Sequence, residues 1–258
     1  VRTEEQEEMA KLLRQKSQLV VAFGSCAHLG GVPGLANFWD RESIFELVYR
    51  QVPSVVNPEQ VVPQQRVPTP YGELHLPEFY DTVRTLDQVI AVDYYLPGCA
   101  PPPDLIMNAV TAILKGELPE KGEVLAPPKA LCDTCALNET KPEKISIKEI
   151  KRVSLVPVDT SKCFLAQGII CLGPATRGGC GERCINANMP CRGCFGPTKG
   201  VIDMGAKFLS ALASIVDAND PEEVEKIMDS VIDPAGLFYM YSLPKSILRR
   251  KKMEATHA

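Results

Sequence analysis

The apolar residues at the start of the chain change from a helical spacing to a strand-like run. Residues 3–15 carry their apolar side chains on one helical face, behind a capping-box pattern that begins at Thr3. A short apolar run at residues 19–23 follows and stops at Gly24. These patterns predict a helix followed by a buried parallel strand.

The same alternation returns further along the chain. Residues 88–92 form an apolar run typical of a strand, and the turn at 96–99 leads through three prolines into an amphipathic segment that stops at Lys115 and Gly116. Alternating helices and apolar strands are typical of an open α/β sheet. Between the two units, the proline-rich residues 40–80 predict an irregular insertion with a short helix near its start.

Beyond residue 116 the pattern becomes less regular. Residues 116–129 are rich in Pro, Glu, Lys and Gly, which is typical of a linker. Periodic apolar residues return only at 204–216 and in a second segment that Asp220 caps, so we expect two helices there. We interpret the basic run at 249–252 as a solvated end, with docking as the alternative.

The composition is that of an ordinary globular protein. The chain has 258 residues, of which 45% are hydrophobic and 23% charged, and its formal net charge is -4. No apolar run approaches the roughly 18 residues that span a bilayer, and the slight acidity gives no reason to expect nucleic acid. Because the chain starts at Val1 and enters a helix at once, we expect that it is a fragment without its original N-terminus.

Cysteine is the unusual residue, with ten copies against three histidines. Disulfide frameworks occur mostly in chains of fewer than about 100 residues, so this chain is too long and too apolar to need them. Eight of the cysteines lie in a glycine-rich segment without hydrophobic period, where bound metal could supply the folding free energy. Iron-sulfur clusters and structural zinc are both candidates, and we favour the clusters.

Two isolated cysteines follow the two predicted strands. Cys26 comes after Gly24, and Cys99 comes after Gly98, each just beyond the carboxyl end of its strand. In open α/β sheets this edge is where ligands bind, so we expect both thiols to face one crevice. The alternative is that both are small buried thiols of the core.

The other eight cysteines divide into two sets of four, because the motif Cys-x-Gly-Pro occurs twice and closes each set. The first set is Cys132, Cys135, Cys163 and Cys171, and the second set is Cys180, Cys184, Cys191 and Cys194. A cubane cluster needs four thiolates, so each set could hold one 4Fe-4S cluster. Two Cys-x-x-Cys pairs also resemble a zinc ribbon, but a ribbon needs only four cysteines.

Three features together resemble the small subunit of a nickel-iron hydrogenase: the Gly-Ser-Cys-Ala stretch at 24–27, the Leu-Pro-Gly-Cys-Ala-Pro-Pro turn at 96–102 and the eight-cysteine segment. The resemblance covers essentially the whole chain and is greatest to the cytoplasmic, methyl-viologen-reducing type associated with heterodisulfide reductase. It implies a partial flavodoxin-like open parallel sheet domain at 1–118, an irregular cysteine-rich iron-sulfur domain at 119–200, and C-terminal helices with a basic tail at 201–258.

The resemblance also implies a role for each cysteine. Cys26 and Cys99 would be two ligands of a proximal 4Fe-4S cluster, whose other two ligands belong to an N-terminal Cys-x-x-Cys motif that this sequence does not contain. The first set would hold the distal cluster and the second set the medial cluster, both of the 4Fe-4S type. The chain would contribute no catalytic residue, because the nickel ligands lie on the large subunit in this family.

The function that the resemblance implies is electron transfer from hydrogen oxidation to a partner redox subunit in the cytoplasm. The partners would be the nickel-iron large subunit and a downstream acceptor, such as a heterodisulfide-reductase protein or another flavin or iron-sulfur protein. Apolar residues near Cys26, among them Val32 and Trp39, would contact a partner, with packing onto the chain's own sheet as the alternative. The alternatives are a complex I-like quinone oxidoreductase subunit, which generally carries only the proximal cluster, and a zinc-stabilised interaction module.

Overall fold

Two short parallel strands lie at the centre of the first half of the chain. The computed structural model describes residues 1–218 and 220–248, so the basic run at 249–252 lies outside the described residues. Strand β1 (Val21–Phe23) pairs in parallel with β4 (Tyr94–Leu96), and the two form a small sheet.

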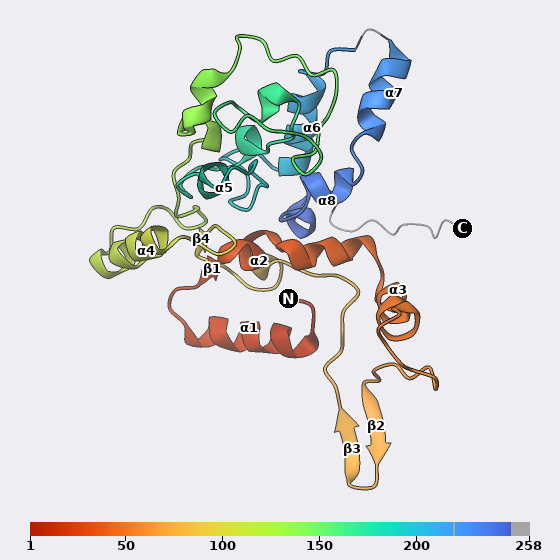
Figure 1. Ribbon diagram of the computed structural model, residues 1–258. Coiled ribbons are helices and arrows are strands. Elements are labelled where there is room, and N and C mark those ends of the chain that lie inside the picture. The colour runs from red at the N-terminus through yellow and green to blue at the C-terminus, as the bar shows by residue number, and fades with distance from the viewer. Residues whose placement is uncertain (219, 249–258) are drawn as a thin grey trace.

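Helices precede and follow these strands, as Figure 1 shows. They are α1 (Glu4–Lys16), α2 (Gly24–Leu29), α3 (Arg41–Glu46) and α4 (Pro103–Lys115), with the 3-10 helices η1 (Val32–Phe38) and η3 (Leu86–Gln88) between them. The predicted capping box is present, because Thr3 and Gln6 each accept the other's backbone N–H through their side chains. Helix α4 ends at Gly116 in the left-handed conformation, as predicted. The predicted α/β class is therefore confirmed.

The strand predicted at residues 88–92 is wrong, because the paired strand begins only at Tyr94. Residue Thr85 caps a 3-10 turn, in which its backbone N–H donates to Gln88 Oε1 at 3.0 Å. Asp93 then sets the start of pairing, since its carboxylate accepts the Val20 N–H at 2.8 Å and an Arg14 N–H at 2.6 Å. Local capping and this long-range clamp outweigh the strand propensity of the apolar run.

The proline-rich insertion contains the expected short helix, α3, and also a hairpin that the sequence did not indicate. Helix α3 continues into a π-helical turn, η2 (Leu47–Gln51), and strands β2 (Arg66–Thr69) and β3 (Gly72–His75) then pair antiparallel. The hairpin projects away from the rest of the molecule (Figure 1).

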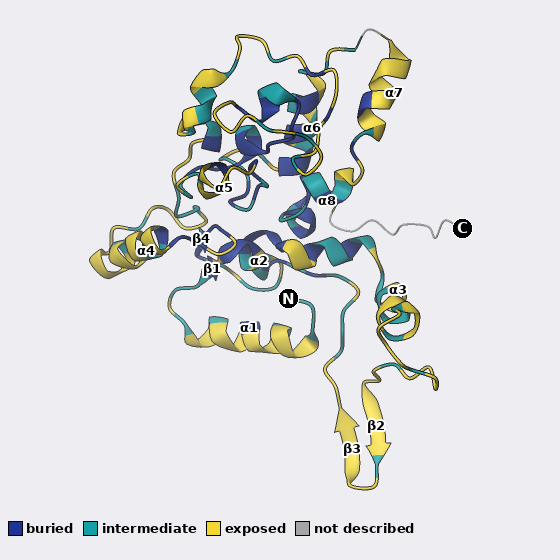
Figure 2. Cartoon of the chain, viewed as in Figure 1, coloured by how far each residue is buried: buried dark blue, intermediate teal, exposed yellow. Residues whose placement is uncertain are grey.

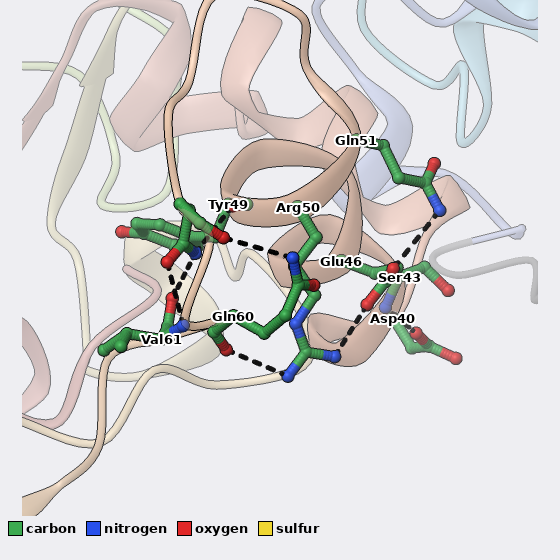
Figure 3. Close-up of polar contacts among 9 residues, drawn as sticks. Asp40, Ser43, Glu46, Tyr49, Arg50, Gln51, Gln60 and Val61 are labelled. Carbon is green, nitrogen blue, oxygen red and sulfur yellow. Dashed lines mark hydrogen bonds and ion pairs between the residues drawn. The ribbon is translucent and has the colours of Figure 1, made fainter.

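Polar contacts hold the base of this projection together (Figure 3). The Arg50 guanidinium donates to Glu46 Oε2 at 2.9 Å and to the Gln60 carbonyl at 3.3 Å. The Asn57 amide donates to the carbonyls of Tyr49 and Val61 at 2.8 and 2.7 Å. These bonds close the loop between η2 and the hairpin.

The second half of the chain has little regular structure before its final helices. The cysteine-rich part contains η4 (Leu131–Asp133), η5 (Ala136–Thr140), η6 (Leu165–Gln167), η7 (Gly173–Ala175) and α5 (Arg183–Asn186). The final helices are α6 (Met204–Ala213), α7 (Pro221–Asp229), α8 (Pro234–Phe238) and η8 (Leu243–Lys245). The expected helices are present, and the Asp220 carboxylate caps α7 by accepting the Glu223 N–H at 2.9 Å.

The largest core joins the cysteine-rich part to the final helices. Phe208 of α6 stacks at 5.6 Å on Phe238 of α8, and both pack with Leu172 and Cys163 of the cysteine-rich part. Figure 2 shows buried residues gathered around α6 and α8, whereas the projecting hairpin is exposed. The cysteine loops therefore derive their position from these helices.

Candidate metal centres

The four cysteines of the first set border one hollow. Its four thiols come from four loop or 3-10 segments, and the same hollow is bordered by Leu131, Leu137, Phe164 and Ile185. Three of these apolar residues come from the segments that carry the cysteines themselves. Local 3-10 turns thus bring the thiols inward, and the apolar side chains limit the access of water to them.

Gly173 gives the clearest sign that the space between these sulfurs is reserved. A Cβ atom at this position would lie 3.1 Å from Cys132 Sγ and 3.6 Å from Cys171 Sγ. Any other residue would therefore place carbon against two of the four sulfurs. Glycine leaves room for a group that the thiols share.

Burial disfavours the thiolate form of two of these thiols, those of Cys132 and Cys171. It raises the pKa of Cys132 to about 11, against the opposing effect of the nearby Lys141 ammonium. Burial also raises the pKa of Cys171, although the backbone N–H groups of Gly173 and Cys191 point at its sulfur and act in the opposite direction. A metal cation bound between such thiols would supply the missing positive charge and deprotonate them.

The second set is assembled on α5 and the glycine-rich loops beside it. Cys184 lies on α5 and is exposed, whereas Cys191 is buried, which raises the pKa of its thiol. Burial raises the pKa of Cys194 to about 11, and the negative charges of Cys180 and Cys184 act in the same direction. The four thiols of this set therefore lie within electrostatic reach of one another.

A polynuclear cluster fits the first set better than a single ion does. A structural zinc ion needs four ligands at about 2.0–2.3 Å from one point. No group of three or more His, Cys, Asp or Glu side chains within residues 1–218 and 220–248 is placed so that it could hold one metal ion. The sulfurs of the first set border a hollow, and a cubane cluster would occupy that kind of space.

Cys26 lies in α2 and Cys99 in the bend after β4, so both come just beyond the carboxyl ends of the paired strands. The Ser25 N–H donates to the Gly98 carbonyl at 2.8 Å, so the residues that precede the two cysteines are hydrogen-bonded. Both thiols are exposed, which rules out the alternative of two buried core thiols. Gly31 approaches Cys26 so closely that a Cβ there would lie 2.6 Å from its Sγ.

Two aromatic side chains, Tyr241 and His28, also lie near the cysteines or beside the segment that carries Cys26. Burial raises the pKa of Tyr241 to about 12, and the thiols of Cys194 and Cys99 next to it act in the same direction. Buried His28 lies 4.6 Å from the Tyr95 ring, and burial lowers its pKa to about 4. Among the described residues its Nδ1 finds no hydrogen-bond partner. These contacts join distant segments, so no local pattern could have indicated them.

Comparison with known proteins covers both halves of the chain. Residues 1–113 match the family model of the NADH ubiquinone oxidoreductase 20 Kd subunit. The iron-sulfur subunit of the F420-non-reducing hydrogenase of Archaeoglobus profundus is 41% identical over 253 residues, which are 97% of this chain and 78% of that protein. The corresponding F420-non-reducing hydrogenase subunit of Methanothermobacter marburgensis is 39% identical over 96% of this chain and 77% of its own length.

A solved structure gives a more distant match. The crystal structure of an NAD+-reducing [NiFe]-hydrogenase in the H2-reduced state aligns with a TM-score of 0.41 and 30% identity over 46% of this chain and 62% of that chain. No helix within the described residues is long and apolar enough to cross a membrane.

The two kinds of match differ in what they say about the cysteines. The oxidoreductase model ends at residue 113, before the first cysteine set, whereas the hydrogenase relatives extend over nearly the whole chain. The matches therefore favour a hydrogenase subunit over a complex I-like subunit. Membership in this family implies that the chain binds iron-sulfur clusters. The chain belongs to the family of F420-non-reducing hydrogenase iron-sulfur subunits, and is thus an electron-transferring small subunit of a nickel-iron hydrogenase, an oxidoreductase that acts on H2.

Proposed function

We propose that this chain carries electrons from hydrogen oxidation through two complete 4Fe-4S sites and one shared proximal site. The distal site would be ligated by Cys132, Cys135, Cys163 and Cys171, and the medial site by Cys180, Cys184, Cys191 and Cys194. Cys26 and Cys99 would contribute to the proximal site. The observation that carries this proposal is the hollow that four thiols share, with Gly173 keeping the space between two of them free.

The bound clusters would supply one-electron redox chemistry, and the chain's own residues would set its conditions. The Cys191 backbone N–H donates to Cys171 Sγ at 3.3 Å, and such a bond to a ligand sulfur would stabilise the more negative, reduced state of a bound cluster. Buried Phe164 and Leu131 keep water from the distal thiols. Because these residues keep water away from the thiols, they would favour electron transfer that is not coupled to proton transfer.

We further propose that the large hydrogenase subunit covers the surface around Cys26, which α2 and η1 form. Phe23 and Trp39 next to this surface are 52% and 51% exposed, and Val32 is 46% exposed. Apolar side chains gathered beside exposed ligand thiols indicate a protein interface. The acceptor would be a flavin or iron-sulfur subunit at the distal side, and we place the complex in the cytoplasm.

The projecting hairpin would extend the same interface. We define the arm as residues 61–76, in which Tyr71 is 100% exposed and Leu74 62% exposed. An isolated two-stranded hairpin is marginally stable in water, so a partner would be needed to order it. Leu47 and Val48 of η2 are also exposed and lie along the chain between the surface around Cys26 and the arm. This continuity favours the large subunit as the partner that would bind the arm.

Polar residues at the tip of the arm should weaken the complex. We expect the double variant Tyr71→Ser, Leu74→Asp to bind the large subunit about tenfold or more weakly, because buried aromatic and aliphatic anchors dominate interface energetics. Co-purification and titration of the separately produced subunits measure this effect. Leu114→Asp is the control, since Leu114 is 82% exposed on α4, away from the arm. Equal binding by both variants would show that the arm lies outside the interface.

Metal analysis tests the proposed cluster content. The two complete sites predict roughly eight irons and eight acid-labile sulfides per chain, since each 4Fe-4S cluster takes four of each. Anaerobically purified protein should be brown, with broad visible absorbance. Zinc at about two per chain with no sulfide would refute the electron-transfer proposal and support a zinc-stabilised module.

A further inference from the structure

Ser25 joins three segments of the chain that each carry a proposed cluster ligand. It directly precedes Cys26, and its backbone N–H donates to the carbonyl of Gly98, the residue before Cys99, at 2.8 Å. Its hydroxyl donates to the carbonyl of Cys194 at 2.7 Å, across 169 positions of sequence. One residue therefore connects the proximal cysteines to the medial set.

The contact is buried and specific. Ser25 is 1% exposed, so water cannot readily replace its hydroxyl as the donor to Cys194. Cys99 also contacts Cys194. The Cys99 backbone N–H points at Cys194 Sγ, and the Cys99 thiol lies close enough to affect the pKa of Cys194. Two independent contacts, from Ser25 and from Cys99, thus hold Cys194 against the segments that carry Cys26 and Cys99.

Cys194 ends the short segment 191–194, and the other end of this segment, Cys191, is hydrogen-bonded to the first cysteine set. The Cys191 backbone N–H donates to Cys171 Sγ at 3.3 Å, and the Leu172 N–H donates to the Cys191 carbonyl at 3.0 Å. Residues 191–194 therefore form a bridge that is fixed at both ends. At the Cys191 end the donors are backbone N–H groups that side-chain substitution leaves in place, whereas at the Cys194 end the Ser25 hydroxyl is a side-chain donor beside the backbone N–H of Cys99.

We propose that Ser25 is a positioning residue that sets the separation between the proximal and medial sites, a proposal that rests on the proposed electron-transfer function. The site that Cys99 would ligate would give up one electron per event to the site that Cys194 would ligate, so the first would be oxidised and the second reduced. No bond is broken and no proton moves. Because electron transfer depends on the distance between donor and acceptor, the Ser25 hydroxyl influences its rate without ligating metal.

The test uses the complete hydrogenase complex with Ser25→Ala, with Ser25→Thr as the conservative variant. All cysteines remain, so iron and sulfide contents should equal those of the unaltered complex. Because electron transfer slows as donor and acceptor move apart, we expect Ser25→Ala to lower the rate of proximal-to-medial electron transfer below that of the unaltered complex. The magnetic interaction between the two reduced sites, measured by electron paramagnetic resonance, should also weaken, and Ser25→Thr should restore both signals.

Ser246→Ala is the matched control. Ser246 is also buried, and its hydroxyl donates to the Leu243 carbonyl at 2.7 Å, but within the C-terminal segment. This variant should leave the magnetic interaction and the transfer rate unchanged. The proposal is overturned if Ser25→Ala keeps both signals, or if it loses iron as well, since that would show a merely structural role. Absence of iron-sulfur signals from the unaltered complex would instead refute the proposed function itself.

Discussion

Cys171→Ala should abolish cluster binding at the first cysteine set and leave the second set loaded. Cys171 is buried, borders the shared hollow and accepts the Cys191 N–H at 3.3 Å. Its loss leaves three thiols and one buried N–H without its acceptor, and alanine can provide neither ligand nor acceptor. Iron content should fall by about half, from roughly eight to four per chain for these two sites. Electron delivery to the downstream acceptor should be lost with it.

Cys184→Ser gives the comparison that tests how the cysteines are divided. Cys184 is the exposed member of the second set, so we expect that site to convert to a three-iron cluster while the first set keeps its own. Electron paramagnetic resonance of the oxidised variants distinguishes the two sites. If Cys171→Ala and Cys184→Ser removed the same signal, the division into two sets would be wrong.

Phe208→Ala should destabilise the C-terminal half of the protein by about 3–5 kcal/mol, which is typical of a buried phenylalanine. Phe208 is 1% exposed and stacks on Phe238 at 5.6 Å. It also packs in the core that contains Leu172 and Cys163, so the cavity would loosen the loops that carry the first set. Denaturant unfolding followed by circular dichroism measures the loss, and the rate of iron release should rise in parallel.

Leu114→Ala is the control for this measurement. Leu114 is 82% exposed on α4, and surface substitutions of this kind usually change stability by no more than about 0.5 kcal/mol. If Phe208→Ala unfolded at the same denaturant concentration as Leu114→Ala, the core that joins the final helices to the cysteine loops would be misassigned. The predicted boundary near residue 200 between cysteine-rich and helical domains stays a prediction, although Phe208 and Leu172 share one core across it.

Several elements could be predicted from sequence because their signals are local. The capping box at Thr3, the stop at Gly116 and the cap at Asp220 each depend on residues within one helical turn, and the structure confirms all three. The two cysteine sets were indicated in the same way, by the repeated Cys-x-Gly-Pro ending. The structure brings the first set around one hollow.

Elements that depend on distant partners could not be predicted. Strand β4 has only three residues, which is too short to show a period, and the Asp93 clamp to Val20 decides where it begins. The β2–β3 hairpin lies in a proline-rich stretch whose apolar residues face solvent, so no buried face shaped its pattern.

Local signals were enough to specify the helix ends and the α/β class, because caps and turns act over a few residues, whereas the division of the thiols into two ligand sets stays a prediction. The connections between the three groups of thiols arise only when the whole chain has packed. The Ser25 bond to Cys194 spans 169 positions, and the Cys191 bond to Cys171 spans 20. The free energy of such contacts depends on burial that no single segment provides, so the amino-acid pattern around either partner carries no sign of them.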